Sequence, residues 1–338
     1  MARGELIRKL LLSHMRGNDE EFRSTAMQVI SEEENKNNHR LAKDLLRIIE
    51  NNSAGGLSKQ LFTGNGYPVP KDQERQTLLV DIRESEHVMS DILLSKEAEK
   101  VVDRLLHEYR KSELLRVHGM KPSTKLLFCG PPGCGKTLCS EIIAKELGLP
   151  LLYTRFDAIV SSYLGETAAN LRKVFDYAKS GRWVILFDEF DAIGKARNNS
   201  TEHGELKRVV NSFLQLLDSF NAPSLVIAAT NHEQLLDPAL WRRFDEILFF
   251  PKPSISEIHS LLSMKLKNFP HVGLGLKTAA IKFKGLSHAD VEHVCFDAVK
   301  AAILDGRDSV DQEIFEQALK RHKKRLAIAK EAGNRGSP

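Results

Sequence analysis

Residues 126–137 read Leu-Leu-Phe-Cys-Gly-Pro-Pro-Gly-Cys-Gly-Lys-Thr, a short apolar run that ends in the pattern G-x-x-x-x-G-K-T and is followed by a helical pattern. Glycines let the backbone wrap so that its N–H groups point at phosphate. The following helix offers its N-terminal N–H groups and positive dipole end to the same anion. Lys136 is expected to reach the β- and γ-phosphates, and the Thr137 hydroxyl to hold Mg²⁺. The sequence therefore predicts a strand, a nucleotide-phosphate loop and a helix, with binding residues Gly130, Pro131, Pro132, Gly133, Cys134, Gly135, Lys136, Thr137 and Leu138.

The composition is that of an ordinary soluble protein. The chain has 338 residues, of which 42% are hydrophobic and 28% charged, with a formal net charge of +4. This length leaves room for about two or three domains. No apolar run reaches the ~20 residues that a membrane span needs, and the charged N-terminus is unlike a signal peptide. The four cysteines lack zinc-site spacing, so we expect reduced thiols and a cytoplasmic location.

Changes in pattern divide the chain into four expected parts. Residues 1–52 carry apolar stripes at helical spacing and are expected to form a small helical domain. Residues 53–94 begin rich in Gly and Pro and are expected to form a linker or extended arm, in which residues 78–93 can contain a strand. Residues 95–251 alternate strands and helices, which predicts a parallel sheet with helices on both faces. Residues 252–338 carry only helical patterns and are expected to form a C-terminal helical domain with a basic tail.

Polar residues follow two of the apolar strands. Asp188 and Glu189 close the apolar run 183–187, and Asn231 follows the run 224–229. Asp188 is expected to bind Mg²⁺ through water, and Glu189 to polarise the water that attacks the γ-phosphate. Alternatively, the two acids only cap the next turn. The side-chain amide of Asn231 is expected to lie beside the two acids and to orient the attacking water, although Thr-Asn alone is a turn signal.

Two adjacent arginines, Arg242 and Arg243, come after these acids in the chain. They can pair with Asp237 or Asp245 on the surface. They can instead reach the γ-phosphate of a neighbouring subunit as arginine fingers, which would stabilise charge in the transition state. The sequence leaves both alternatives open, and it does not say which arginine reaches across.

The order of these motifs resembles that of the AAA+ ATPases, and within them the AAA clade, over about residues 95–325. The resemblance implies an α/β P-loop AAA+ ATPase domain with a parallel sheet, a C-terminal helical lid and a small N-terminal helical domain. It also implies ATP and Mg²⁺ as ligands and assembly into a ring, expected to be a hexamer. The matching motifs are Walker A (130–137), Walker B (185–193, with the downstream Asp191), sensor 1 (Asn231), the second region of homology (236–245), the lid signature (285–290) and the closing helix (315–319).

The resemblance also gives a function to Tyr163, Leu164 and Gly165. In this clade an aromatic-aliphatic-glycine tripeptide forms the first pore loop, and such loops line a central channel and grip an extended polypeptide. Tyr163 and Leu164 would supply apolar contacts that tolerate any sequence, and Gly165 would let the loop bend. A second pore-facing loop is expected at residues 195–205. Taken alone, Tyr163 and Leu164 would rather be loop residues that pack inward.

Three features depart from the family pattern. Arg242 and Arg243 are adjacent, where relatives commonly separate two finger arginines by an insert. His288 stands at the usual lid glycine, so that His288 and Ala289 are expected near the adenine base. The family's usual Ile-Gly-Gly segment before the first strand is missing, so residues 78–94 must supply the base pocket in another way.

We therefore expect an ATP-hydrolysing ring that remodels, unfolds or threads protein substrates through its pore. One alternative is an ATPase subunit that regulates a separately encoded partner, such as a protease or effector, held by the N-terminal helical domain. Another is a nucleic-acid motor, for which the basic stretch 320–325 is the only local support and against which the aromatic pore loop argues. We expect neither nucleic acid nor a membrane as a partner.

Overall fold

In this computed structural model the described residues are 68–73, 75–154, 159, 164–191, 203–236, 238–271 and 273–335, with scattered residues between 6 and 29. The chain divides into two units, residues 1–63 and 64–338. In the first unit the described residues are helical, and Leu6 and Ala26 are buried. Most of the predicted N-terminal helical domain lies outside the described residues.

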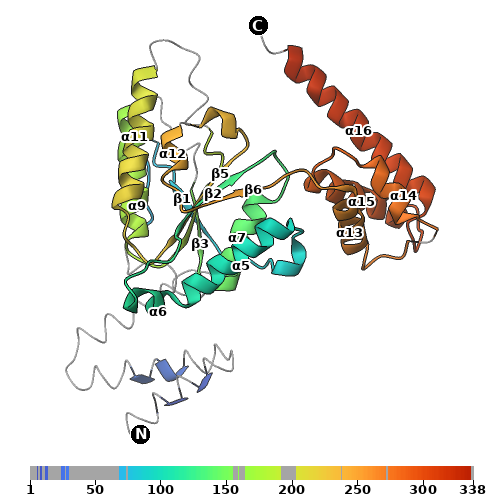
Figure 1. Cartoon of the computed structure of the whole chain (residues 1–338). Coiled ribbons are helices and arrows are strands. Elements are labelled where there is room, and N and C mark those ends of the chain that lie inside the picture. The colour runs from blue at the N-terminus through green and yellow to red at the C-terminus, as the bar shows by residue number, and fades with distance from the viewer. Residues whose placement is uncertain are drawn as a thin grey trace. The chain divides into compact units, whose positions relative to one another are not determined.

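A six-stranded sheet forms the centre of the second unit, in the order β1-β3-β4-β5-β2-β6 (Figure 1). Neighbouring strands are parallel, except that β1 runs antiparallel to β3. Strands β4 and β5 are wholly buried, as expected for parallel strands covered on both faces. The strands are β1 (Val80–Arg83), β2 (Lys125–Cys129), β3 (Leu151–Thr154), β4 (Val184–Phe187), β5 (Leu225–Thr230) and β6 (Glu246–Phe249).

Helices cover both faces of this sheet (Figure 1). On β4, Val184 and Leu186 pack in one apolar layer with α5 and α7, while Ile185 and Phe187 pack in the other with α9 and α11. This alternation follows from the two-residue period of a strand, and it confirms the predicted α/β fold. The helices are η3 (Met89–Asp91), α5 (Lys96–Arg110), α6 (Ser112–Val117), α7 (Lys136–Leu147), α9 (Leu164–Ala178), α11 (His203–Ser219), η5 (Glu233–Leu235) and α12 (Pro238–Trp241).

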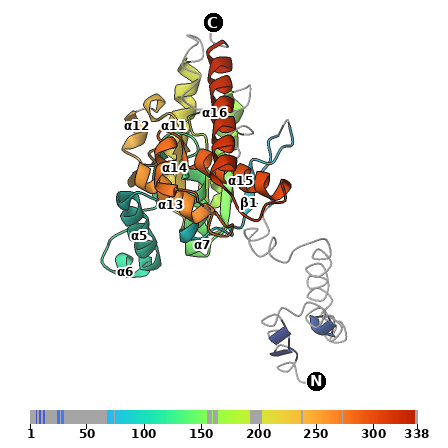
Figure 2. The same ribbon diagram turned by 90° about the vertical axis from the view of Figure 1, so that its right-hand side faces the viewer.

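A helical bundle follows β6 and faces the viewer in Figure 2. It consists of α13 (Ile255–Lys265), α14 (Leu276–Lys282), α15 (His288–Leu304) and α16 (Gln312–Arg335). Ser254 and Ser287 begin α13 and α15 with capping boxes, in which two backbone N–H groups at the helix start gain side-chain acceptors. The bundle has its own apolar core around Phe283 and Phe315, and we refer to it as the lid.

The segment expected to be a linker contributes to the sheet. Residues 80–83 form edge strand β1, paired with β3, and Val80 is fully buried. An edge strand has one neighbour and buries few side chains, so the mixed sequence Val-Asp-Ile-Arg is easily mistaken for a charged linker. Just before it, Asn170 Nδ2 of α9 donates a hydrogen bond to Asp72 Oδ2 at 2.7 Å, with both side chains buried. The arm is therefore packed on the second unit from about residue 69 onward.

The cysteines are buried free thiols. Burial raises the pKa of Cys129, Cys139 and Cys295 to about 12, and burial also raises the pKa of Cys134. Because the thiolate is the reactive form, burial disfavours reaction of these thiols at neutral pH. In the described part of the chain, no helix is both long and apolar enough to cross a membrane.

Candidate nucleotide site

The loop between β2 and α7 has a backbone that only glycine adopts easily. Gly130 has φ 138°, and a Cβ there would lie 2.3 Å from the carbonyl oxygen of Phe250. The loop therefore leaves β2 in direct contact with the end of β6, which any side chain would prevent. Gly135, with φ 94°, is the N-cap of α7, so that the N-terminus of this helix opens into the loop. Backbone N–H groups and the helix dipole favour an anion at this point.

Lys136 supplies the positive charge of the loop. Its Nζ donates hydrogen bonds to the carbonyl oxygens of Gly130 (2.7 Å) and Pro131 (2.9 Å), and the residue is buried. Burial lowers the pKa of Lys136, an effect that Cys134 and Asp188 partly offset. An ammonium group has three donors, so one N–H is left for a ligand. A buried cation with a spare donor fits a phosphate group.

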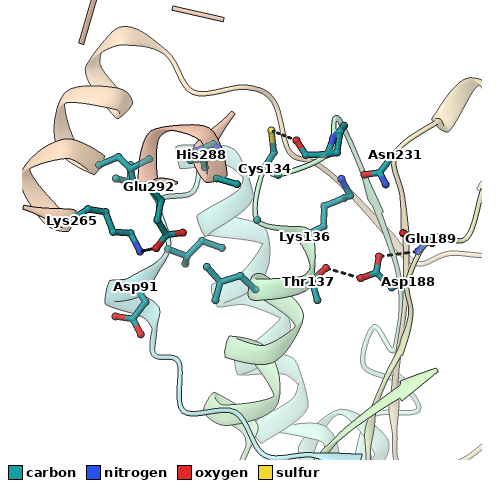
Figure 3. Close-up of a pocket in the computed structure, with 18 residues that line it drawn as sticks. Asp91, Cys134, Lys136, Thr137, Asp188, Glu189, Asn231, Lys265, His288 and Glu292 are labelled. Carbon is teal, nitrogen blue, oxygen red and sulfur yellow. Dashed lines mark hydrogen bonds and ion pairs between the residues drawn. The ribbon is translucent and has the colours of Figure 1, made fainter. Parts of the chain in front are cut away.

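A hydroxyl and a carboxylate meet beside this lysine. Thr137 Oγ1 donates to Asp188 Oδ2 at 2.7 Å (Figure 3), and the backbone N–H of Glu189 donates to Asp188 Oδ1 at 2.9 Å. Oxygen ligands of these two kinds fit Mg²⁺, which keeps several waters and also binds substrate phosphates. Thr137 and Asp188 could therefore hold the ion.

Glu189 has an unusual backbone, with φ 53°. A residue other than glycine in this left-handed region stores strain, which is common at functional sites. Beside it, the N–H of Asn231 donates to Asp191 Oδ1 at 3.3 Å, and Asp191 is almost fully buried. Asp191 thereby fixes the backbone that carries the amide of Asn231. Asp188, Glu189 and Asn231 meet because β4 and β5 are neighbours whose carboxyl ends lie at the same edge of the sheet.

These groups line a cavity of about 350 Å³ (Figure 3). One end of the cavity, to which the sequence assigns the phosphates, is lined by residues 132–138 of the loop and helix with Asp188, Glu189 and Asn231. Gly130 and Pro131, also predicted to bind nucleotide, do not line it. Residues Asp91, Ile92 and Leu93, within the segment 78–94 that was expected to supply the base pocket, lie at the other end together with the lid. The lid contributes the predicted His288 and Ala289, and also Leu261, Lys265 and Glu292, which the sequence did not indicate.

The end of the cavity that the lid forms is polar, and one of its buried polar atoms lacks a hydrogen-bond partner among the described residues. Lys265 and Glu292 form an ion pair between α13 and α15. His288 Nδ1 is buried without a hydrogen-bond partner among the described residues. Burial lowers the pKa of His288, against a smaller opposite effect of Glu257, so the imidazole is neutral at pH 7. A neutral, unpaired ring nitrogen fits the polar edge of a nucleoside.

The lid rests directly on the phosphate loop at Gly133. The N–H of Ala289 donates to the carbonyl oxygen of Gly133 at 3.0 Å. Gly133 has φ 72°, and a Cβ there would lie 2.8 Å from Ser287 Oγ and 3.1 Å from Ala289 Cβ. Glycine therefore permits a close approach that closes the cavity between the loop and the lid.

The variant Gly133→Ala is expected to raise the KM for ATP about tenfold, because it pushes the lid from the loop at a cost of about 1–3 kcal/mol. Initial ATPase rates over a range of ATP concentrations measure this. Gly148→Ala is the matched control, because Gly148 also has positive φ (62°) but no atom within 4 Å of its would-be Cβ. It should lower stability and leave KM unchanged. Equal KM values for the two variants would contradict the close contact.

The two arginines lie outside the cavity. Arg243 Nε is 3.3 Å from Asp218 Oδ2 at the end of α11, with both side chains about half exposed. Arg242 is exposed and forms no ion pair with the described residues. Asp245 Oδ2 instead accepts the backbone N–H groups of Thr124 and Lys125, so the surface pairing with Asp245 considered from the sequence is wrong. Asp237 lies outside the described residues.

The predicted pore segments are only partly described. Tyr163 lies outside the described residues, and Leu164 and Gly165 begin α9, where their side chains are not described. Residues 195–202 of the second predicted loop also lie outside, and α11 begins at His203.

The fold and the cavity define a nucleotide-binding P-loop protein, and comparisons with known proteins give the family. The AAA family, "ATPase family associated with various cellular activities", matches residues 126–252. The uncharacterized AAA family ATPase y4kL of Sinorhizobium fredii is 45% identical over 327 residues, which cover 97% of each chain. This chain belongs to the AAA family, as predicted, and is an ATPase.

Two further relatives carry functional names. The proteasome-activating nucleotidase of Thermococcus onnurineus is 33% identical over 235 residues, 68% of this chain and 59% of that protein. The ATP-dependent zinc metalloprotease FtsH 3 of Sphaerobacter thermophilus is 32% identical over 253 residues, 73% of this chain and 52% of that protein. The chain thus spans little more than half the length of these two relatives.

Proposed function

We propose that this ATPase works as a ring of identical subunits, a hexamer, that remodels, unfolds or threads protein substrates through a central pore. The observation that carries the proposal is the separation of Arg242 and Arg243 from the cavity of their own subunit. Among the described residues that line the cavity there is no arginine, whereas these two are exposed next to α12. A heterologous interface, repeated around a ring, would bring the arginine of one subunit to the γ-phosphate of the next.

Within this proposal the residues predicted from the sequence have distinct roles in ATP turnover. Thr137 and Asp188 hold Mg²⁺, which when bound neutralises charge on the β- and γ-phosphates. Lys136 and the loop N–H groups bind the phosphates, and Glu189 polarises the attacking water that the Asn231 amide orients. At the other end, residues 91–93 with His288 and Ala289 enclose the nucleoside.

The substrate is proposed to be protein, gripped by Tyr163, Leu164 and Gly165. Helix α9 begins at Leu164, so a change in the position of this helix would move the tripeptide directly. The names of the two functionally described relatives connect a nucleotidase with a proteasome and ATP with a metalloprotease. They also favour a second candidate, in which the ring serves a separately encoded protease or effector bound to the N-terminal helical domain, residues 1–52.

The basic stretch 320–325 gives weaker support to a nucleic-acid motor than the features above give to a protein substrate. Lys323 Nζ donates to the carbonyl oxygen of Lys282, at the end of α14, at 2.7 Å. Arg325 Nη1 lies 3.0 Å from His293 Nε2 on α15. Both cations thus have structural partners within the lid, but all five cations of the stretch, including Lys320, Arg321 and Lys324, are exposed. A solvated face of α16 accounts for such a run of cations as well as a nucleic-acid surface does.

Replacement of Tyr163 by Ala is expected to leave ATP turnover within about twofold and to lower substrate processing at least tenfold, because the aromatic grip is lost. A folded fluorescent protein with an unstructured tail serves as substrate, and loss of its fluorescence measures unfolding. Tyr163→Phe keeps the ring and should retain most of the unfolding activity. Unchanged unfolding by Tyr163→Ala would refute the pore assignment.

A further inference from the structure

Residues 285–290 of the lid, which include the start of α15, lie against the phosphate loop. Ser287 packs on Gly133, and the next residue but one, Ala289, donates its N–H to the carbonyl oxygen of Gly133. Ser287 is also the N-cap of α15. The position of Ser287 therefore determines both where α15 starts and how closely the lid approaches the nucleotide cavity.

Asp290 fixes Ser287 through one of its carboxylate oxygens. Its Oδ2 accepts the backbone N–H of Ser287 at 2.8 Å and the hydroxyl of Ser287 at 2.7 Å. Burial by itself would raise the pKa of Asp290, but the hydrogen bonds from Ser287 and His322 outweigh burial and lower the pKa. The carboxylate is therefore charged at neutral pH, and a charged acceptor makes strong hydrogen bonds.

The other oxygen of Asp290 is bound by the C-terminal helix. His322 Nε2 on α16 lies 2.9 Å from Asp290 Oδ1, and the His322 side chain is 1% exposed. With Nε2 donating, Nδ1 is left buried with no partner among the described residues. A histidine buried at this cost is poorly explained by packing alone, because an apolar side chain would fill the space without an unpaired nitrogen. His322 does not line the nucleotide cavity.

We propose that His322 is a positioning residue for the nucleotide site. It holds Asp290, Asp290 holds Ser287, and Ser287 keeps the lid docked on Gly133, so that α16 controls the closure of the cavity from the side away from the nucleotide. The proposal rests on nucleotide binding by the family fold and needs neither the ring nor the pore. It predicts that loss of His322 weakens nucleotide binding and leaves the rate of hydrolysis at saturating ATP unchanged, because Glu189 and Asn231 are untouched.

The test compares His322→Phe with His322→Gln. Phe fills the site without a donor, whereas the amide nitrogen of Gln can take the place of Nε2. His322→Phe should raise the Kd for ADP, measured by calorimetry, and the KM for ATP about tenfold, with kcat within about twofold. This is the factor expected for loss of one hydrogen bond to a charged group. His322→Gln should return both constants to within about threefold of the parent values.

His293→Phe is the control for lid packing. The His293 ring lies 5.3 Å from the His322 ring, but His293 takes no part in the hydrogen bonds that join His322, Asp290 and Ser287. Its replacement should therefore leave the ADP Kd unchanged. If His322→Phe does not fold, His322→Asn takes its place, because the shorter side chain does not reach Asp290.

Two results would overturn the proposal. The first is an ADP Kd of a folded His322→Phe or His322→Asn variant within twofold of the parent value. The second is equal impairment of the Gln variant and the donor-free variant, because that would reduce His322 to a packing role. The double variant Gly133→Ala, His322→Phe should raise the Kd by clearly less than the product of the single effects, since both changes loosen one contact.

Discussion

Replacing Glu189 by Gln is expected to leave ATP binding nearly intact and to lower ATP turnover at least about 100-fold. Gln keeps the size of the side chain, but it cannot accept a proton from the attacking water. Asp188 and Thr137, which pair at 2.7 Å, remain to hold Mg²⁺, and Lys136 remains to bind the phosphates. The measurements are ATP affinity by calorimetry and phosphate release at saturating ATP.

Glu233→Gln is the matched control for this variant. Glu233 lies at the start of η5, close enough to raise the pKa of Cys129, but it is not among the residues of the cavity. Its neutralisation should leave turnover within about twofold. If Glu189→Gln turned over ATP as fast as the Glu233→Gln control, Glu189 would not be the residue that activates water. An inactive Glu189→Gln variant held with ATP would also serve as a trap from which bound proteins are identified.

The phosphate end of the site could be predicted because its geometry is local. The backbone of residues 130–137 is set by glycines at fixed spacing, so the sequence motif specifies the structure of the loop. To predict that Asp188, Glu189 and Asn231 meet, one further inference was needed, namely that the strands carrying them are parallel neighbours. The alternation of apolar strands and helices supplied that step, and the strand order confirms it.

Fewer residues at the nucleoside end of the cavity could be predicted, because that end depends on how the lid packs against the phosphate loop. Leu261 and Lys265 are one helical turn apart on α13, as are His288 and Glu292 on α15, and such pairs occur on every helix. No local signature says that these particular faces meet across the cavity. The same holds for His322, which lies 32 residues after its partner Asp290 on a stretch that the sequence shows only as basic. A strand was expected somewhere within residues 78–93, and β1 (Val80–Arg83) lies there, but the mixed polarity of an edge strand left its bounds open.

Replacing Arg243 by Ala is expected to lower ATP turnover at least about 100-fold with little change in ATP affinity, since an arginine finger acts on transition-state charge and contributes 10³–10⁵-fold in related phosphoryl transfer. Arg243 is oriented by Asp218 in the free subunit, whereas Arg242 has no such partner among the described residues. We therefore propose Arg243 as the finger, and Arg242→Ala should have the smaller effect. The rate of phosphate release at saturating ATP ranks the two variants. A larger loss of rate for Arg242→Ala than for Arg243→Ala would make Arg242 the finger instead.

If each ATP site is completed by a neighbouring subunit, as we propose, two variants that are inactive alone should complement each other when their subunits are mixed. Arg243→Ala subunits keep an intact phosphate loop, while Lys136→Ala subunits keep an intact finger. In a random one-to-one mixture of ring subunits, roughly a quarter of the interfaces combine the intact halves. The mixture is expected to regain ATPase activity that neither variant has alone. Mixed assemblies that form and stay inactive at every ratio would contradict it.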